Sequence, residues 1–425
     1  MFSAIIIIFI LGYACITLEQ IIKINKSAVA LITAGLCWTV YIFSGVHHNE
    51  VNDQLLEHLA GASGILFFLL GAMTIVELID THDGFDIITG KITTTNKRKL
   101  LWIVCLLTFF LSAVLDNLTT TIVMLSLVRK MVSAKADRLQ FAGMIIIAAN
   151  AGGAWSPIGD VTTTMLWIGN QVTAANIIIK LLLPSAVCLL IPLFFVARNM
   201  KGDVTRPASK IKQKTKREIF ESKLILALGI GTMLFVPVFK TITHLPPFIG
   251  MLFSLGILWA VTEIIHQNKA DKDSFSVVYA LQKIDTPSIL FFLGILLAIG
   301  VLQSTGQLTE MAGWLTAKVK NLNMLTIAIG GLSAVVDNVP LVAATQGMFS
   351  LQQFPTDHYF WEMIAYTTGT GGSILIIGSA SGVIAMGIEK ISFFWYLKRF
   401  GLWALTGYLA GALIYFLQEK LLHVM

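Results

Sequence analysis

Long apolar segments separated by short polar ones run along the whole chain and predict a series of membrane-spanning helices. Segments of about 20 residues with few charges are long enough to cross the hydrocarbon core of a bilayer. Ten such segments are expected, at about 3–22, 27–46, 59–80, 139–170 and 174–197 in the first half, and 222–242, 246–267, 287–303, 359–388 and 393–417 in the second. The pattern predicts an all-α polytopic membrane protein.

Two further apolar segments, 100–128 and 322–350, are too short for two full crossings, which need roughly 40 residues. The first segment lies between two clusters of Lys and Arg, at 97–99 and 129–138. Because cytoplasmic loops collect positive charge, both of its ends are expected on the same side. A re-entrant helical hairpin satisfies this condition, and its broken backbone must then be buried in protein or line a cavity.

A short motif inside each predicted hairpin indicates an internal duplication. The sequence SAVLDN at 112–117 returns as SAVVDN at 333–338. Behind each copy comes a glycine-rich stretch, ANAGGAWSPIGDVTTTM at 149–165 and TGTGGSILIIGSASGVI at 368–384. Glycine and proline interrupt these stretches, which predicts a broken helix in each half.

The predicted order of elements implies that the two halves are inverted relative to each other. Each half carries about five transmembrane helices, a re-entrant hairpin and a broken helix, and an odd number of crossings turns the second copy over. Inverted repeats of this kind are typical of secondary transporters. We expect a first repeat at 1–200, a basic cytoplasmic linker at 201–221 and a second repeat at 222–425.

Composition agrees with a membrane protein and excludes several partners. The chain is 56% hydrophobic and 13% charged, with a mean hydropathy of +0.79. The net charge of +6 comes from basic loops, chiefly 198–221, so we expect a lipid bilayer as partner and no nucleic acid. The sequence has no phosphate-binding glycine-rich loop, so we expect no nucleotide and no cofactor, with transport driven by an ion gradient. It also offers no nucleophile or metal cluster of the kind that an enzyme would need.

Asp116 and Asp337 are the fifth residues of the two motif copies and are the first candidates for ion binding. An ionisable side chain at bilayer depth costs about 2.5–3.5 kcal/mol on insertion scales and is a candidate ion or proton site. The alternative is that each Asp only caps the second helix of its hairpin. The neighbouring amides of Asn117 and Asn338 are expected to add oxygen ligands.

Asp160 follows the interruption of the first broken helix, together with Thr162 and Thr163. Carboxylate and hydroxyl oxygens suit a hard cation, so we expect Na⁺ at Asp116, Asp160 and Thr162. The second half has Ser379 and Ser381 in place of Asp160 and Thr162, so the first half is the stronger candidate for the transported ion. The remaining candidate ligands are Asn150, Gly152 and Thr370.

Glu77 lies near the predicted end of the third helix. It is either a carboxylate that reaches the membrane surface from a helix end or a group that gives protons access to the site. The sequence does not distinguish these alternatives.

The chain resembles the NhaD-type sodium/proton antiporters of the ion transporter superfamily over essentially its whole length. The likeness rests on VELIDTHDGFD at 76–86, SAVLDNLTTT at 112–121, ANAGGAWSPIGDVTTT at 149–164 and SAVVDNVP at 333–340. It implies exchange of Na⁺ (or Li⁺) for H⁺ across the bacterial inner membrane, by a homodimer with an elevator mechanism. It also implies ion-binding or transport roles for Asp116, Asn150, Asp160, Thr162, Thr163, Asp337 and Asn338, and more weakly for Ser379 and Ser381.

Three other functions remain open on the sequence. Sodium-coupled dicarboxylate symporters of the same superfamily have a similar outline but carry a neutral Ser-Asn-Thr at the hairpin tips, where this chain has Asp twice. Carboxylates there would repel an anionic substrate and attract a cation. Efflux of arsenite or another metalloid, which is neutral near pH 7, and a passive ion channel are the other two alternatives.

Overall fold

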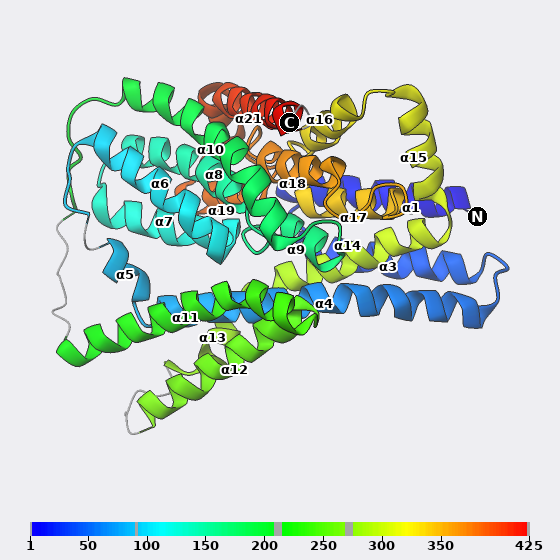
Figure 1. Cartoon of the computed structure of the whole chain (residues 1–425), viewed down its shortest axis with the longest axis horizontal. Coiled ribbons are helices and arrows are strands. Elements are labelled where there is room, and N and C mark those ends of the chain that lie inside the picture. Colours follow the sequence, from blue (N-terminus) through cyan, green and yellow to red (C-terminus); the bar gives the residue numbers. More distant parts are fainter. Residues whose placement is uncertain (1, 90–91, 208–214, 268–274, 423–425) are drawn as a thin grey trace.

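A computed structural model describes residues 2–89, 92–207, 215–267 and 275–422. The helices (Figure 1) are α1 Phe2–Thr17, α2 Glu19–Ile22, α3 Lys26–Ile42, α4 His48–Thr81, α5 Gly84–Thr89, α6 Lys97–Leu115, α7 Asn117–Met131, α8 Lys135–Gly153, α9 Val161–Ile168, α10 Ala174–Asn199, α11 Lys216–Thr243, α12 Pro247–His266, α13 Val277–Lys283, α14 Thr286–Ser304, α15 Gln307–Lys318, α16 Leu322–Leu332, α17 Asn338–Met348, α18 Tyr359–Gly371, α19 Ala380–Glu389, α20 Phe393–Tyr396 and α21 Leu402–Leu422, with a π-helical turn at Leu397–Gly401 between the last two. In these ranges, seven helical spans are long and apolar enough to cross a membrane. The predicted all-α polytopic class is confirmed.

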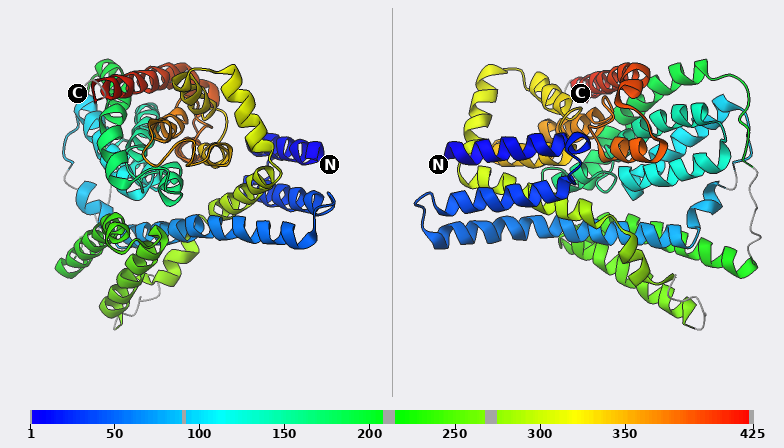
Figure 2. Two further views of the ribbon diagram at one scale, coloured as in Figure 1. Left: turned by 45° about the vertical axis from the view of Figure 1, so that its right-hand side comes forward. Right: turned by 180° about the vertical axis from the view of Figure 1, so that it is seen from behind.

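The helices gather into two layers joined by α14. In Figures 1 and 2, α4, α11 and α12 lie together on one side of the molecule, while α6 to α10 and α16 to α21 form the larger body. Helix α14 contacts α3 and α4 and also reaches α17 in the larger body. The chain therefore crosses between the layers several times, and side chains from both can meet at α14.

The predicted first hairpin is formed by α6 and α7, which the single residue Asp116 separates. Its two open ends meet one short segment: the amide of Lys97 donates to Gly202 O at 3.0 Å, and the amide of Ser133 donates to Thr205 O at 2.9 Å. The chain therefore enters and leaves this hairpin on the same side of the molecule. The second hairpin consists of α16 and α17, joined by residues 333–337.

Both broken helices are present, as the glycine and proline positions predict. Helices α8 and α9 are separated by residues 154–160, and α18 and α19 by residues 372–379. In each, the second helix begins after an extended residue whose side chain caps it. Asp160 accepts from the amide of Thr162, and Ser379 accepts from the amide of Gly382.

Corresponding residues of the two motif copies make the same packing contacts. Ser112 Oγ donates to Ala149 O at 2.6 Å, and Ser333 Oγ donates to Thr368 O at 2.8 Å. Each bond holds a hairpin against its own broken helix. Gly152 and Gly371 permit the same approach, because a Cβ at either would lie 2.2 Å from a carbonyl oxygen of the neighbouring hairpin.

Several helix bounds differ from those predicted. Helix α4 starts at His48 rather than near 59, and the polar segment before the apolar run includes the helix formers Glu, Gln and Leu. Helices α13 and α15 were not predicted, since each is short and mixes polar with apolar residues. Helix α11 starts at Lys216, inside the predicted linker, where Thr215 and Glu218 form a capping box. Residues 208–214 of that linker lie outside the described residues.

Replacing Gly152 with Ala should destabilise the protein, because the new Cβ would press on the backbone of Phe109. Overpacking of this kind typically costs about 1–3 kcal/mol, which would lower the thermal unfolding temperature measured in detergent. Gly231→Ala in α11 is the matched control, since a Cβ there meets nothing within 4 Å. Equal unfolding temperatures for both variants would contradict the close packing of hairpin and broken helix.

Candidate ion-binding site

Asp160 is held at the start of α9 in the interior of the larger body. Only 1% of its surface is exposed. Its Oδ1 atom accepts hydrogen bonds from the amide of Thr162 at 2.9 Å and from Thr162 Oγ1 at 2.8 Å. The helix N-terminus and the hydroxyl both favour the ionised carboxylate, so Asp160 is at once a cap and a buried negative charge.

The tips of both hairpins meet at this carboxylate. Asn117 at the start of α7 donates its Nδ2 hydrogen to Asp160 Oδ2 at 2.5 Å. Asn338 at the start of α17 donates to both carboxylate oxygens at 3.4 Å, a longer and weaker contact. Asn338 lies 178 positions from Asp160 in the chain, yet it and Asn117 share this one acceptor.

Asn150 extends the polar network from α8 into the second half. It accepts from Asn117 Nδ2 at 3.1 Å and donates to Ser373 Oγ and Ser379 Oγ, each at 2.8 Å. Ser373 was not predicted as part of the site, although it directly follows the paired glycines of the second broken helix. The side-chain amide of Asn150 therefore links the end of α8 to the segment between α18 and α19.

Asp116 at the first hairpin tip is partly exposed and has no cationic partner. Its two oxygens accept from the amide and from Oγ1 of Thr119, each at 2.8 Å. Its backbone lies in the left-handed region with φ of 71°, which is unusual for a residue with a side chain and turns the chain sharply between α6 and α7. Among the residues that the structure describes, no Lys, Arg or His forms an ion pair with Asp116 or Asp160.

Asp337 at the second hairpin tip has a different environment. Its Oδ1 atom accepts from the amide of Val339 at 3.3 Å, and its Oδ2 atom pairs with Lys26 Nζ at 3.0 Å. The sequence analysis missed Lys26. Its position directly before the second apolar segment did not mark it, because a lysine at the end of a membrane span ordinarily belongs to a basic loop.

One small cavity brings the three carboxylates together. Its volume is about 40 Å³, which leaves room for a water-sized occupant such as a small cation. Its charged lining residues are Asp116, Asp160, Asp337 and Lys26, so negative charge exceeds positive charge there. The polar remainder includes Asn117 and Asn338.

The carboxylates do not form a ready-made chelating cluster. In the described part of the chain, no three His, Cys, Asp or Glu side chains converge closely enough to hold a metal ion. A bound Na⁺ would therefore need amide, hydroxyl or backbone oxygens in addition to carboxylate oxygens. The side chains of Asn117 and Asn338 line the cavity and carry such amide oxygens.

The other predicted residues lie at varying distances from the cavity. Thr163 Oγ1 donates to Asp160 O, and Thr370 Oγ1 donates to Tyr366 O, so both hydroxyls serve their own helices. Ser381 is fully buried, and its hydroxyl has no hydrogen-bond partner. Glu77 pairs with Lys283 of α13 at 3.4 Å, one helical turn beyond Met73 of the cavity wall.

A buried carboxylate cavity between broken helices and hairpin tips, in a polytopic membrane protein, is the architecture of a secondary active transporter. The family model described as "Citrate transporter" matches residues 6–361. The chain is 46% identical to "Sodium/proton antiporter 1" of Arabidopsis thaliana, over 98% of this chain and 73% of that protein. It is 43% identical to "Sodium/proton antiporter 2" of the same plant, over 96% and 98%. It is 30% identical to the "Na(+)/H(+) antiporter NhaD" of Vibrio cholerae, over 97% and 91%.

The chain therefore belongs to the NhaD-type sodium/proton antiporters, within the family whose model is described as a citrate transporter. These relatives are named as transporters or antiporters.

Replacing Asn117 with Ala should destabilise the protein more than replacing Asn338 with Ala. The first change removes a short hydrogen bond to a buried carboxylate, worth about 1.5–3 kcal/mol, whereas the second removes only 3.4 Å contacts. Thermal unfolding of both purified variants in detergent compares the two losses. Equal destabilisation would mean that the hairpin tips hold Asp160 equally.

Proposed function

We propose that the chain exchanges Na⁺ or Li⁺ for H⁺ across a membrane, and that Asp116 and Asp160 carry the exchanged ions. The observation that carries this proposal is the cavity at the meeting point of the two hairpin tips, where neither carboxylate pairs with a Lys, Arg or His of the described residues. The names of the plant and bacterial relatives support the same pair of ions.

Coupling follows from competition for one site. A cation bound between Asp116 and Asp160 is stabilised by their negative charge, and protons bound to the same oxygens remove that charge. The two loads therefore exclude each other, and no separate energy-transducing part is needed. The amides of Asn117 and Asn338 would turn their oxygens toward the cation, and Thr162 would supply a hydroxyl oxygen.

The charge of the cavity disfavours an anionic substrate. The helix N-termini of α7, α9 and α17 would attract an anion if they were free. Here each is already capped by a carboxylate of the chain itself, Asp116, Asp160 and Asp337. A dicarboxylate would meet like charges at short range in a site of low dielectric constant.

The matching contacts of the two motif copies also support a proposal for how the protein is arranged and moves in the membrane. We propose that the halves 1–200 and 222–425 are inverted repeats, because Ser112 and Ser333 make matching bonds. Under this proposal the hairpins and broken helices move as an elevator within a homodimer.

The basic segment 198–221 would face the cytoplasm. The bacterial inner membrane is the proposed location, supported by the NhaD relative of Vibrio cholerae, although the two plant relatives are more similar in sequence.

Asp160→Asn and Asp116→Asn should each abolish Na⁺-dependent proton movement, because the amide neither takes up a proton nor supplies negative charge. The measurement is ΔpH quenching in everted vesicles, with Na⁺, Li⁺, K⁺ and arsenite added in turn. Asp53→Asn, on an exposed part of α4, is the matched control and should retain activity.

Full activity of either site variant would contradict the shared-site mechanism. A response to arsenite, succinate uptake by proteoliposomes, or conductance far above transporter turnover would instead support one of the other functions.

A further inference from the structure

We infer that the Lys26 ammonium occupies the cation position of the second hairpin, so that the cavity takes up one exchangeable cation, at its Asp116–Asp160 end. The inference rests on the proposed exchange of cations. It gives a role to Lys26, which lies outside the repeated motifs. It also limits the load of one chain to a single exchangeable cation.

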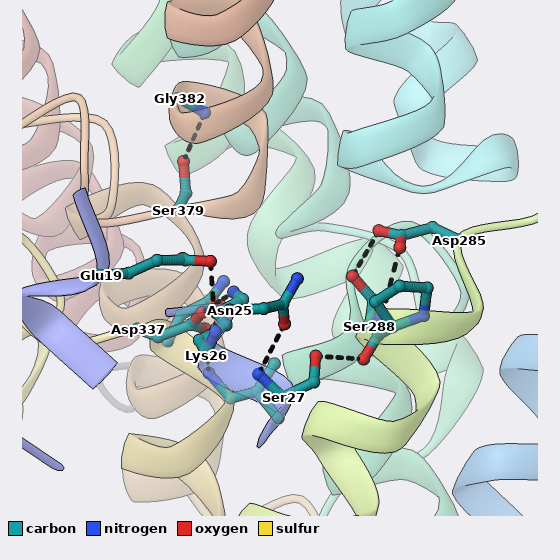
Figure 3. A network of polar contacts seen from close by, with 12 residues as sticks. Glu19, Asn25, Lys26, Ser27, Asp285, Ser288, Asp337, Ser379 and Gly382 are labelled. Carbon is teal, nitrogen blue, oxygen red and sulfur yellow. Dashed lines mark hydrogen bonds and ion pairs between the residues drawn. The ribbon is translucent and has the colours of Figure 1, made fainter. Parts of the chain in front are cut away.

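Lys26 reaches into the cavity from outside the hairpin that it neutralises. Its Nζ atom lies 3.0 Å from Asp337 Oδ2 and 4.2 Å from the centre of the Phe291 ring (Figure 3). The Lys26 and Asp337 side chains are only 20% and 16% exposed. An ammonium on an aromatic face beside a carboxylate is a stable arrangement for a cation that has lost most of its water.

The backbone around Lys26 is fixed by contacts that do not involve the hairpin. Asn25 Oδ1 caps α3 by accepting from the amide of Ser27 at 2.8 Å, and the amide of Lys26 donates to Glu19 Oε1 at 3.1 Å. Ser27 Oγ donates to Pro287 O at 2.6 Å, which fastens the start of α3 to the start of α14 (Figure 3). The ammonium is therefore supplied by α3, and the carboxylate by the loop before α17.

The two copies of the motif differ in this respect. Asp116 and Asp337 occupy the same position in SAVLDN and SAVVDN. Asp337 has the Lys26 ammonium, whereas Asp116 accepts from the amide and hydroxyl of Thr119 and pairs with no Lys, Arg or His among the described residues. Their backbones differ as well, with φ of 71° at Asp116 and −52° at Asp337. Of the two equivalent carboxylates, Asp337 thus has a lysine ammonium beside it, and Asp116 pairs with no basic side chain of the described residues.

The Lys26–Asp337 pair also separates two cavities. Both residues line the carboxylate cavity and also a second cavity of about 50 Å³. Tyr13 and Glu19 contribute to the wall of the second cavity. Lys26 and Asp337 therefore lie at the boundary between the two cavities.

Removing one charge of the pair should change cation binding in opposite directions. Lys26→Gln leaves Asp337 as a third carboxylate without a partner, so it should bind Na⁺ at least tenfold more tightly or take up a second Na⁺. Asp337→Asn leaves the ammonium without its partner, so Na⁺ affinity should fall at least tenfold. The double variant restores the charge balance and should bind one Na⁺ with an affinity within about threefold of the wild type.

The experiment measures binding of radioactive Na⁺ to the purified full-length protein by scintillation proximity, at pH 9 to limit competition by protons. Lys23→Gln removes an equal charge from an exposed site three residues away and is the matched control. If the single variants do not fold, the double variant alone still tests the inference, because its neutral pair must retain one-site binding.

Three outcomes would overturn the inference: two Na⁺ ions bound to the wild type, unchanged binding in both single variants, or loss of one-site binding in the double variant. Failure of the proposed function is distinguishable, because the wild type would then neither bind Na⁺ nor show Na⁺-dependent ΔpH quenching. A wild type that exchanges Na⁺ for H⁺, with single variants of unchanged affinity, would contradict only the role of Lys26.

Discussion

The structure depends on keeping negative charge stable in the interior of an apolar protein. Asp160 achieves this by combining a helix N-terminus, the Thr162 hydroxyl and the amides of two separate hairpins. A continuous helix could not provide such a place, because its backbone amides are all paired inside it. The interruptions between α8 and α9 and between α18 and α19 expose backbone amides in the interior, and the hairpin tips pack beside them.

The same interruptions explain why one family can contain transporters for ions of opposite charge. Helix N-termini that point into a cavity attract anions when no acidic side chain caps them. In this chain Asp116, Asp160 and Asp337 cap them, and the excess of negative charge favours a small cation instead. The family model is described by an anion, citrate, whereas the antiporter relatives are named for cations.

The two halves are joined most firmly by polar contacts away from the cavity. Glu389, at the end of α19, is 3% exposed and pairs with Arg129 of α7 at 2.6 Å and with Arg138 of α8 at 3.2 Å. Asn150 adds a second link through Ser373 and Ser379. A buried carboxylate that loses such partners is costly, so these contacts hold the hairpin and the broken helices in one unit. Lys26 on α3 lies outside that unit and forms an ion pair with it at Asp337.

The sequence by itself predicted the long apolar helices and the two interruptions, and it singled out Asp116, Asp160 and Asp337 as candidates. Apolar length, Gly and Pro positions and a repeated motif are local properties that can be read from the chain. It missed α13, α15 and the early start of α4, whose mixed composition carries no strong apolar signal. Only the tertiary structure placed Asn117 and Asn338 on one carboxylate and brought Lys26 to Asp337 across 311 positions. Such partners depend on how distant helices pack, and no local pattern encodes the distance between them.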